Sequence, residues 1–395
     1  MALVLQAYTL AQQYIASILR PTPTKSTMGL KLGVISTAHI NPAAIIRPTE
    51  THPDVILHAI ASRDLESAKQ TARKYHFKKA YGSYQDLLDD SDIDIIYIST
   101  PNGMHYEWAS KALRAGKHVL CEKPFTSNAE EAHRLIELAK EKGLFHWQFH
   151  PAAHLFREIL DSGRYGRILR TNGVMTASPG VPDGDIRWQF ELSGGSLMDM
   201  TYALSFTRFA VHGSNLKEIQ SAVARPYSKD RRVDEAMHSL ILFEDPQDGH
   251  LIQSRIYTDM ACQWAIKGIV PGVWELPSIE VETDQAIIYF YNAMMPHLYH
   301  YISITDKSTG KTEYKKQYKG GPCWGEAWTT GGKGGKSYWS TYRYQLEAFT
   351  EKVRGKNVPY WISGEESILQ METIDAIYKA AGLPARPSSS KSEKA

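Results

Sequence analysis

Three short motifs contain the side chains that could carry out proton-transfer chemistry. They are Thr100-Pro-Asn102-x-x-His105, Glu122-Lys123-Pro124 and Asp199-x-x-Tyr202. Oxidation of an alcohol needs a group that accepts the hydroxyl proton and groups that orient the carbinol, and side chains of these types do both. Taken singly, each has an ordinary structural explanation: Lys123 as a surface lysine before a turn proline, Tyr202 as a core tyrosine, and His105 as a capping or core histidine.

The first half of the chain must supply the elements that position these motifs. Apolar runs predict strands at 30–36, 55–61, 93–99 and 118–121, and helical periodicity predicts helices from near Ile40 and over 64–75, 104–115 and 129–142. Strands that alternate with helices indicate an α/β fold with a doubly wound parallel sheet. Ligands of such sheets lie at the carboxyl ends of the strands, where two of the three motifs stand.

A dinucleotide would place its pyrophosphate at the turn after the first strand. The usual glycine fingerprint is replaced here by Ser36-Thr37-Ala38-His39-Ile40-Asn41, which has no glycine. The small residues Ser36 and Ala38 still allow a close approach of the backbone, and N–H groups at a helix N-terminus bind phosphate without glycine. An ordinary strand-to-helix turn remains the alternative for this segment taken alone.

The end of the second strand favours NADP over NAD. An NAD site usually has an acidic residue there, which binds the ribose 2′-hydroxyl. This chain has Ser62-Arg63 instead. A hydroxyl and a guanidinium fork suit a 2′-phosphate, whereas a solvated surface arginine is the structural alternative.

The motif set resembles that of the glucose–fructose oxidoreductase/inositol dehydrogenase/rhizopine catabolism (Gfo/Idh/MocA) family. The residues that carry the resemblance include Thr100-Pro-Asn102-x-x-His105, Glu122-Lys123-Pro124 and Gly194-Gly195-Ser-Leu-Met-Asp199-Met-Thr-Tyr202, and the similarity extends from Leu30 to Pro384. Within the family, the chain is most similar to the branch of dimeric dihydrodiol dehydrogenase and NADP-dependent D-xylose dehydrogenase.

The resemblance implies a second, α+β domain with an open, mostly antiparallel sheet that carries the substrate site and often the oligomer interface. The residue pattern agrees, with strands expected at 168–175, 238–243, 250–258, 278–282 and 286–291 and helices at 340–353 and 364–381. The aromatic residues Tyr338, Trp339, Tyr342 and Tyr344 suit a wall against a sugar or aromatic diol, or a helix packed on the sheet.

The resemblance also assigns roles at the site. Tyr202 would exchange the proton, and Lys123 would hold the substrate oxygen and lower the tyrosine pKa by its charge. Asp199, on the same helical face, would orient Lys123 or a substrate hydroxyl. Further expected cofactor contacts come from the strand ends and from the second domain: Glu122 at the nicotinamide ribose, Thr100, Asn102 and His105 at the mouth, and Arg187.

The chain departs from the family pattern at three places. The glycine fingerprint is lost, Thr201 replaces a glycine common in relatives, and the segment 143–151 is shortened, with Gln148 in place of an arginine. This segment should be the crossing between the domains. The departures leave altered substrate choice and lost or redirected activity as alternatives.

Composition limits the remaining possibilities. The chain has 395 residues, with 45 Lys+Arg against 43 Asp+Glu, so nucleic acid is not expected as a partner. The cysteines Cys121, Cys262 and Cys323 form no C-x-x-C pair, which argues against zinc and disulfides and favours the cytoplasm. We expect an extension and linker over 1–28 without stable membrane insertion, a dinucleotide-binding domain over 29–150, a substrate domain over 151–384 and a disordered tail over 385–395.

The leading functional hypothesis is an NADP-dependent oxidoreductase that acts on a hydroxyl or carbonyl of a sugar or cyclic diol. The alternatives are a redox-neutral epimerase, dehydratase or isomerase with a retained cofactor, and a dinucleotide-sensing regulator without turnover. No metal is expected. The resemblance implies a homodimer or a higher homo-oligomer.

Overall fold

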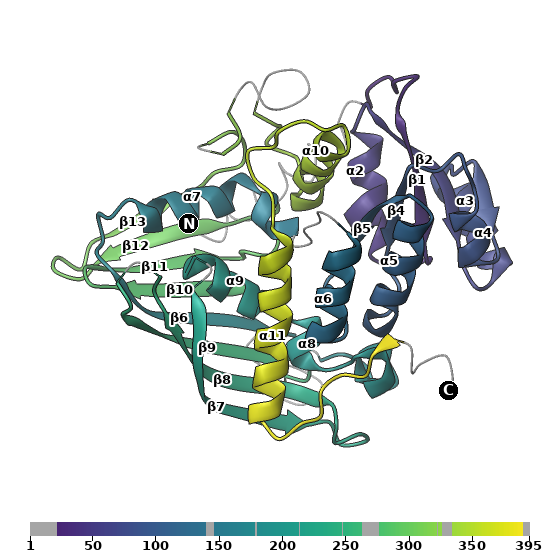
Figure 1. Cartoon of the computed structure of the whole chain (residues 1–395). Helices are drawn as coiled ribbons and strands as arrows, with labels where there is room; N and C mark the ends of the chain where they lie inside the picture. The colour runs from purple at the N-terminus through teal and green to yellow at the C-terminus, as the bar shows by residue number, and fades with distance from the viewer. Residues whose placement is uncertain are drawn as a thin grey trace, which may run out of the picture.

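The computed structural model describes residues 22–139, 146–177, 180–212, 214–246, 248–262, 276–321, 323–325 and 334–389. Two sheets lie side by side and are joined by the last helices of the chain (Figure 1). Residues 1–21 of the expected extension lie outside the described residues. No helix in the described part of the chain has the length and apolarity required to cross a membrane.

The first sheet confirms the predicted Rossmann-type domain. Its five strands are all parallel and lie in the order β3-β2-β1-β4-β5. The strands are β1 (Leu30–Ile35), β2 (Val55–Ala61), β3 (Lys79–Tyr81), β4 (Ile95–Ile98) and β5 (His118–Cys121). The order reverses between β1 and β4, so the switch point that accepts ligands in such sheets lies beside residues 36 and 99.

Helices flank this sheet, and local side chains fix where several of them begin. They are η1 (Pro42–Ile46) with α2 (Arg47–Glu50), α3 (Leu65–Tyr75), α4 (Tyr84–Leu88), α5 (His105–Arg114) and α6 (Ala129–Leu138). The Asp64 carboxylate accepts a hydrogen bond from the backbone N–H of Glu66 and so caps α3. Asn128 caps α6 in the same way.

The second sheet confirms the open, mostly antiparallel sheet. Its order is β13-β12-β11-β10-β6-β9-β8-β7, and β6 with β9 is its one parallel pair among the described residues. The strands are β6 (Ile168–Thr176), β7 (Asn215–Pro226), β8 (Asp234–Glu244), β9 (Leu251–Asp259), β10 (Ser278–Thr283), β11 (Ala286–Tyr291), β12 (Tyr301–Asp306) and β13 (Thr312–Lys315).

One face of the second sheet is covered by helices and the other is open. Helices α7 (Pro151–Asp161) and α9 (Tyr202–Ala210) lie over the covered face (Figure 1). In β11, Ile288 and Phe290 are buried beneath this layer, whereas Ile287 and Tyr289 point to the open face. Short helices connect β6 to α9: η4 (Ile186–Trp188), η5 (Phe190–Leu192) and α8 (Ser196–Asp199).

The two last helices join the sheets. Helix α10 (Thr341–Val353) follows the second sheet in sequence, but its Tyr342, Leu346 and Phe349 share a core cluster with Leu32 of β1. Helix α11 (Gly364–Ala380) contacts α6 of the first domain and β7 of the second (Figure 1). Domain orientation therefore depends on packing that is remote in sequence.

The disordered tail predicted from residue 385 is wrong for residues 385–389. Arg386 and Ser389 are 1% and 2% exposed, because the arginine forms a buried ion pair with Asp234. Residues 390–395 of that tail lie outside the described residues. Within the expected linker, the Lys25 ammonium donates to the carbonyl oxygens of His52 at 2.7 Å and Val55 at 3.0 Å, so the chain is already packed there.

Candidate active site

Lys123 and Asp199 bring the two main motifs into contact. Lys123 follows β5, and its Nζ donates to the backbone oxygen of Asp199 at 2.7 Å and to Asp199 Oδ1 at 3.1 Å. The side chains are 19% and 17% exposed, so the pair lies at the edge of the protein interior. The peptide bond Lys123–Pro124 is cis.

Asp199 accepts a second cation on its other oxygen. Arg187 Nε, from η4, lies 3.2 Å from Asp199 Oδ2, and its Nη1 lies 3.0 Å from Asp185 Oδ1. Burial alone would raise the pKa of Asp199, but the charges of Lys123 and Arg187 hold this pKa below its ordinary value. Asp199 is therefore a carboxylate that fixes both cations.

Tyr202 lies next to this cluster and is 3% exposed. Lys123 Nζ is 5.5 Å from the centroid of its ring. Burial, together with Tyr342, Glu122 and Asp199, raises the pKa of Tyr202 well above its ordinary value. The contribution expected from the Lys123 charge stays a prediction, since burial is the largest effect on this pKa.

Asp199 and Tyr202 do not share one helix, contrary to the expectation from their spacing. Helix α8 ends at Asp199, and α9 begins at Tyr202 after the intervening Met200 and Thr201. Thr201 is fully buried, and its Oγ1 accepts a hydrogen bond from Gln370 Nε2 of α11 at 2.9 Å. The break turns Asp199 and Tyr202 toward Lys123 by backbone geometry rather than by helical periodicity.

Tyr342 is a site residue whose role the sequence did not reveal. The sequence grouped it with an aromatic wall or a packed helix, whereas its hydroxyl is hydrogen-bonded to that of Tyr202. It is 8% exposed and projects from the first turn of α10. The only local signal was the concentration of aromatic residues at 338–344.

Glu122 is held between β4 and the Lys123 backbone. The Tyr97 hydroxyl donates to Glu122 Oε1 at 2.6 Å, and the Lys123 N–H donates to Glu122 Oε2 at 3.3 Å. Burial raises the pKa of Glu122 above its ordinary value. A carboxyl group fixed in this way can accept a hydrogen bond from a ribose hydroxyl.

His105 does not line an open mouth as expected, because it is only 1% exposed. Its Nδ1 lies 2.7 Å from the Pro124 oxygen and its Nε2 lies 2.9 Å from the Thr100 oxygen. It therefore ties the loop after β4 to the loop that carries Lys123. Asn102 Nδ2 donates to the Ser193 oxygen at 3.3 Å and so links this loop to the second domain.

The turn after β1 keeps the backbone geometry of a glycine turn without the glycine. Ser36 has φ of 89°, in the region that favours glycine. Asn41 Nδ2 donates to the Ser36 oxygen at 2.8 Å, whereas the buried Asn41 Oδ1 has no hydrogen-bond partner among the residues that the structure describes. Thr37 Oγ1 lies 3.2 Å from Ser67 Oγ of α3, and Ala38, His39 and Ile40 complete the turn before the helix.

Arg63 lies beside this turn. Burial raises the pKa of the Tyr84 hydroxyl, whereas the neighbouring side chains of Arg63 and Ser36 act to lower it, so the ends of β1 and β2 meet at one phenol. Ser62 Oγ accepts from the N–H of Asp64 at 3.3 Å. Within the described part of the chain, the buried Thr100 Oγ1 after β4 has no hydrogen-bond partner. An exposed arginine and orphaned polar atoms at the switch point fit a phosphorylated dinucleotide.

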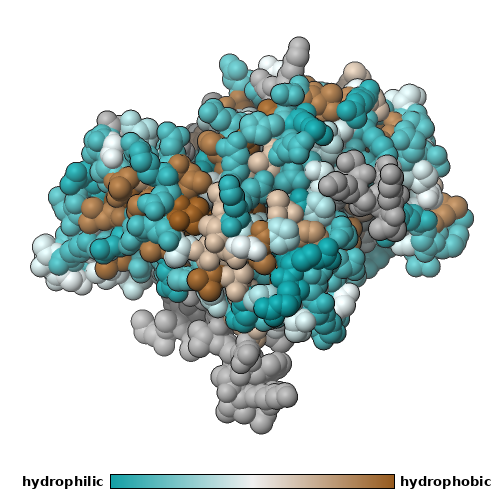
Figure 2. Space-filling model, turned by 60° about the horizontal axis from the view of Figure 1, so that its bottom comes forward, coloured by the Kyte–Doolittle hydropathy of each residue, from teal (hydrophilic) through white to brown (hydrophobic). Residues whose placement is uncertain are grey.

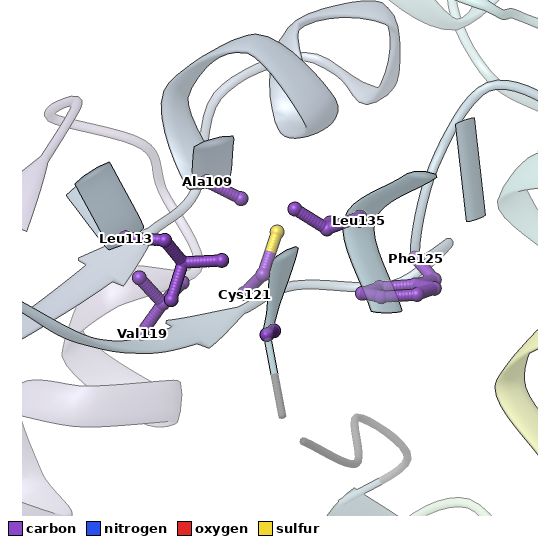
Figure 3. Close-up of a pocket in the computed structure, with 7 residues that line it drawn as sticks. Ala109, Leu113, Val119, Cys121, Phe125 and Leu135 are labelled. Atoms are coloured by element: carbon purple, nitrogen blue, oxygen red, sulfur yellow. The ribbon is translucent and has the colours of Figure 1, made fainter. Parts of the chain in front are cut away.

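A small apolar cavity lies between β5 and the helices α5 and α6 (Figure 3). Its lining includes Cys121 at the end of β5, with Ala109 of α5 and Leu135 of α6 on the opposite wall. Burial raises the pKa of the Cys121 thiol well above its ordinary value. Cys121 is therefore an unreactive core residue, and the side chains that line the cavity are apolar.

The altered crossing segment is packed around Gln148. Its Nε2 donates to Ser205 Oγ of α9 at 3.3 Å, and its Oε1 accepts from the Tyr360 hydroxyl. The glutamine is 3% exposed, so this segment is anchored by a buried, hydrogen-bonded amide. Gly143, Leu144 and Phe145 of this segment lie outside the described residues.

These features define a two-domain protein with a dinucleotide-type parallel sheet and a Lys–Asp–Tyr cluster at the domain junction. The model of an oxidoreductase family with an NAD-binding Rossmann fold matches residues 30–150, and that of the GFO/IDH/MocA C-terminal domain matches residues 154–268. The chain belongs to the GFO/IDH/MocA oxidoreductase family.

Curated relatives include several enzymes. A trans-1,2-dihydrobenzene-1,2-diol dehydrogenase of Xenopus laevis is 32% identical over 66% of this chain and 79% of its own length. The D-xylose 1-dehydrogenase (NADP(+)) 2 of Haloferax volcanii is 28% identical over 89% of this chain and 97% of its own length. A dTDP-3,4-didehydro-2,6-dideoxy-alpha-D-glucose 3-reductase of Actinomadura kijaniata is 37% identical over 43% of this chain, and the match spans only 52% of that relative.

Solved structures share the fold. KijD10, a 3-ketoreductase from Actinomadura kijaniata in complex with NADP and TDP-benzene, superposes with a TM-score of 0.69 at 24% identity, over 89% of this chain and 98% of its own. The aldose-aldose oxidoreductase from Caulobacter crescentus, complexed with glycerol, gives 0.71 at 19% identity, over 90% and 98% of the two chains.

Proposed function

We propose that this protein is an NADP-dependent oxidoreductase that moves a hydride between the nicotinamide and a hydroxyl or carbonyl carbon of a sugar or cyclic diol. The observation that carries the proposal is the convergence of Lys123, Asp199 and Tyr202 beside the switch point of a dinucleotide-type sheet. The NADP-dependent xylose dehydrogenase and the dihydrodiol dehydrogenase among the relatives support the substrate class.

The residues at the strand ends would hold the cofactor. The turn 36–41 would receive the pyrophosphate, Ser62 and Arg63 the 2′-phosphate, and Glu122 a hydroxyl of the nicotinamide ribose. When bound, the nicotinamide supplies or accepts the hydride. The complex of KijD10 with NADP supports this cofactor for the present chain.

The chain's own residues would handle the proton and the substrate oxygen. The pKa of Tyr202 lies well above its ordinary value, so its hydroxyl is protonated at neutral pH and can donate to the oxygen of a carbonyl undergoing reduction. Lys123, held by Asp199, would donate a hydrogen bond to the same oxygen and stabilise its developing negative charge.

Fluorescence titration of the purified protein with NADPH and with NADH tests the cofactor assignment. We expect NADPH to bind more tightly, and Arg63→Ala to remove the preference by weakening NADPH binding about tenfold while leaving NADH unchanged. Arg73→Ala, which removes an exposed arginine in the last turn of α3, is the matched control. Equal affinity for both nucleotides in the wild type would contradict NADP dependence, and turnover without added cofactor would favour a redox-neutral reaction with retained nucleotide.

We also infer a homodimer formed through the open face of the second sheet. Its exposed apolar side chains include Val223 at 64%, Leu251 at 50%, Ile287 at 37% and Tyr314 at 67%. Figure 2 shows hydrophobic residues gathered on the left of the molecule, where this sheet lies.

The three cysteines have no disulfide partner, which supports a location in the reducing cytoplasm.

A further inference from the structure

We propose that the C-terminal segment 384–389, through Arg386, positions the catalytic contact between Lys123 and Asp199. The inference rests on the proposed function, because that function assigns these two residues to catalysis. Arg386 is a positioning residue, since it touches neither member of the pair.

Arg386 acts on the motif that carries Asp199 through a fully buried ion pair. Its Nη2 lies 2.6 Å from Asp234 Oδ1, and both side chains are 0% exposed. Asp234 Oδ2 accepts hydrogen bonds from Ser196 Oγ and from the Leu197 N–H, both at 2.8 Å. Asp234 thereby holds the first turn of α8, the helix that ends at Asp199.

The guanidinium also holds the two glycines that precede α8. Arg386 Nε donates to the Gly194 oxygen at 2.7 Å. Gly195 has φ of 130°, and a Cβ there would lie 2.1 Å from Asp234 Oδ1 and 2.4 Å from Arg386 Nη2. Any larger side chain at residue 195 would therefore collide with the ion pair. The Asp199 N–H donates a hydrogen bond to the Gly195 oxygen at 3.0 Å, which connects this glycine to Asp199.

The same segment also forms hydrogen bonds with the first domain, a few residues after Lys123 in the sequence. The Arg386 oxygen accepts from Asn128 Nδ2 at 3.0 Å, and the Ser389 N–H donates to Glu131 Oε1. Glu131 Oε2 accepts from the Ser127 N–H at 3.0 Å, so the loop between Lys123 and α6 is fixed from the same side. Residues 386–389 therefore bridge the two backbone segments whose side chains meet at the site.

The test substitutes Arg386→Lys in the full chain and measures how fast acetic anhydride acylates Lys123 at about pH 8, by mass spectrometry. Lysine keeps a positive charge beside Asp234 but lacks the planar fork that also reaches Gly194. In the wild type, the hydrogen bonds from Lys123 Nζ to the backbone oxygen and to Oδ1 of Asp199 engage the amine and restrict its attack on the reagent. We expect acylation about threefold faster than in the wild type, since a loosened contact leaves the amine free to react for more of the time.

Arg208→Lys is the matched control. Arg208 is 1% exposed and forms a comparable fork with Glu366 at 2.9 and 3.0 Å, which links α9 to α11 without touching residues 194–199. We expect both variants to melt at lower temperature and only Arg386→Lys to change Lys123 acylation. An unchanged acylation rate in Arg386→Lys, or an equal increase in both variants, would overturn the proposal.

A second variant changes a hydrogen-bond partner of Asp234 instead of Arg386. Ser196→Ala removes one bond to Asp234 without burying an uncompensated charge, and we expect it also to accelerate acylation of Lys123, by about twofold. No acceleration would overturn the proposal.

NADPH titration of the same proteins distinguishes this proposal from the proposed function. We expect each variant to bind NADPH with an affinity within about twofold of the wild type, because residues 384–389 lie on no cofactor loop. Failure of the wild type to bind NADPH would count against the proposed function alone.

Discussion

At the residue scale, Ser36 is strained where relatives of this fold use glycine. A serine at φ of 89° occupies a region that L-residues rarely adopt. We expect Ser36→Gly to raise the free energy of unfolding by roughly 0.5–1 kcal/mol, since relief of strain outweighs the added chain entropy of glycine. Urea denaturation measures the change. Ser91→Gly, at an exposed turn residue without positive φ, should not stabilise the protein, and stabilisation by both variants would refute the strain argument.

Lys123 is expected to contribute to turnover rather than to cofactor binding. Its ammonium contacts Asp199 and lies over the Tyr202 ring, away from the turn after β1. Lys123→Met should lower kcat by about 10²–10³ with little change in NADPH affinity, because it removes a charge that acts on the developing oxyanion. Steady-state kinetics and fluorescence titration measure the two quantities. Lys74→Met, on exposed α3, is the control, and a comparable loss in that variant would contradict the assignment.

At the element scale, the contact between α6 and α11 contains a pH-sensitive carboxyl group. Burial raises the pKa of Asp375 to about 6, although the Ala129 N–H donates to its Oδ2 at 2.8 Å. Its folded pKa exceeds the unfolded value of 3.8, so its contribution to stability is complete below about pH 4 and is lost as the pH rises through 6. The gain in the free energy of unfolding that Asp375→Asn brings over the wild type should therefore be about 1–2 kcal/mol larger at pH 7.5 than at pH 5.

Urea denaturation of Asp375→Asn at the two pH values measures this difference. Glu365→Gln, which changes an exposed carboxylate in the first turn of the same helix, is the control and should leave the pH dependence as it is in the wild type. The same pH dependence in wild type and Asp375→Asn would show that the buried carboxyl group does not govern it.

The elements also show what the sequence could predict. Strands β2 and β5 have the predicted bounds, because strands buried on both faces are continuous apolar runs. Strand β7 was missed, since it is an edge strand with charged side chains outward, and β12 and β13 carry serine, threonine and lysine. Tyr342 and Arg386 were missed for another reason: their partners Tyr202 and Asp234 lie more than a hundred residues away, and no local pattern records such contacts.

At the scale of the whole molecule, the open sheet face should set the oligomeric state. Ile287 lies on this face, whereas Leu138, of similar exposure at 38%, lies on α6 of the first domain. We expect the wild type to sediment as a dimer, Ile287→Lys to shift it to monomer, and Leu138→Lys to leave it dimeric, because a buried unpaired charge opposes association. A dimer in Ile287→Lys would place the interface elsewhere.

The proposed activity requires both domains at once: the cofactor sheet and the Lys123–Tyr202 cluster must act on one substrate. Its most direct test is deuterium transfer from NADPH that carries deuterium at both C4 positions of the nicotinamide to a panel of ketoses, aldoses and cyclic ketones, followed by mass spectrometry. We expect one deuterium in the alcohol product for each NADPH oxidised, with a rate about 10²-fold or more lower in Tyr202→Phe. NADPH that binds but transfers no deuterium to any carbonyl, or an undiminished rate in Tyr202→Phe, would contradict it.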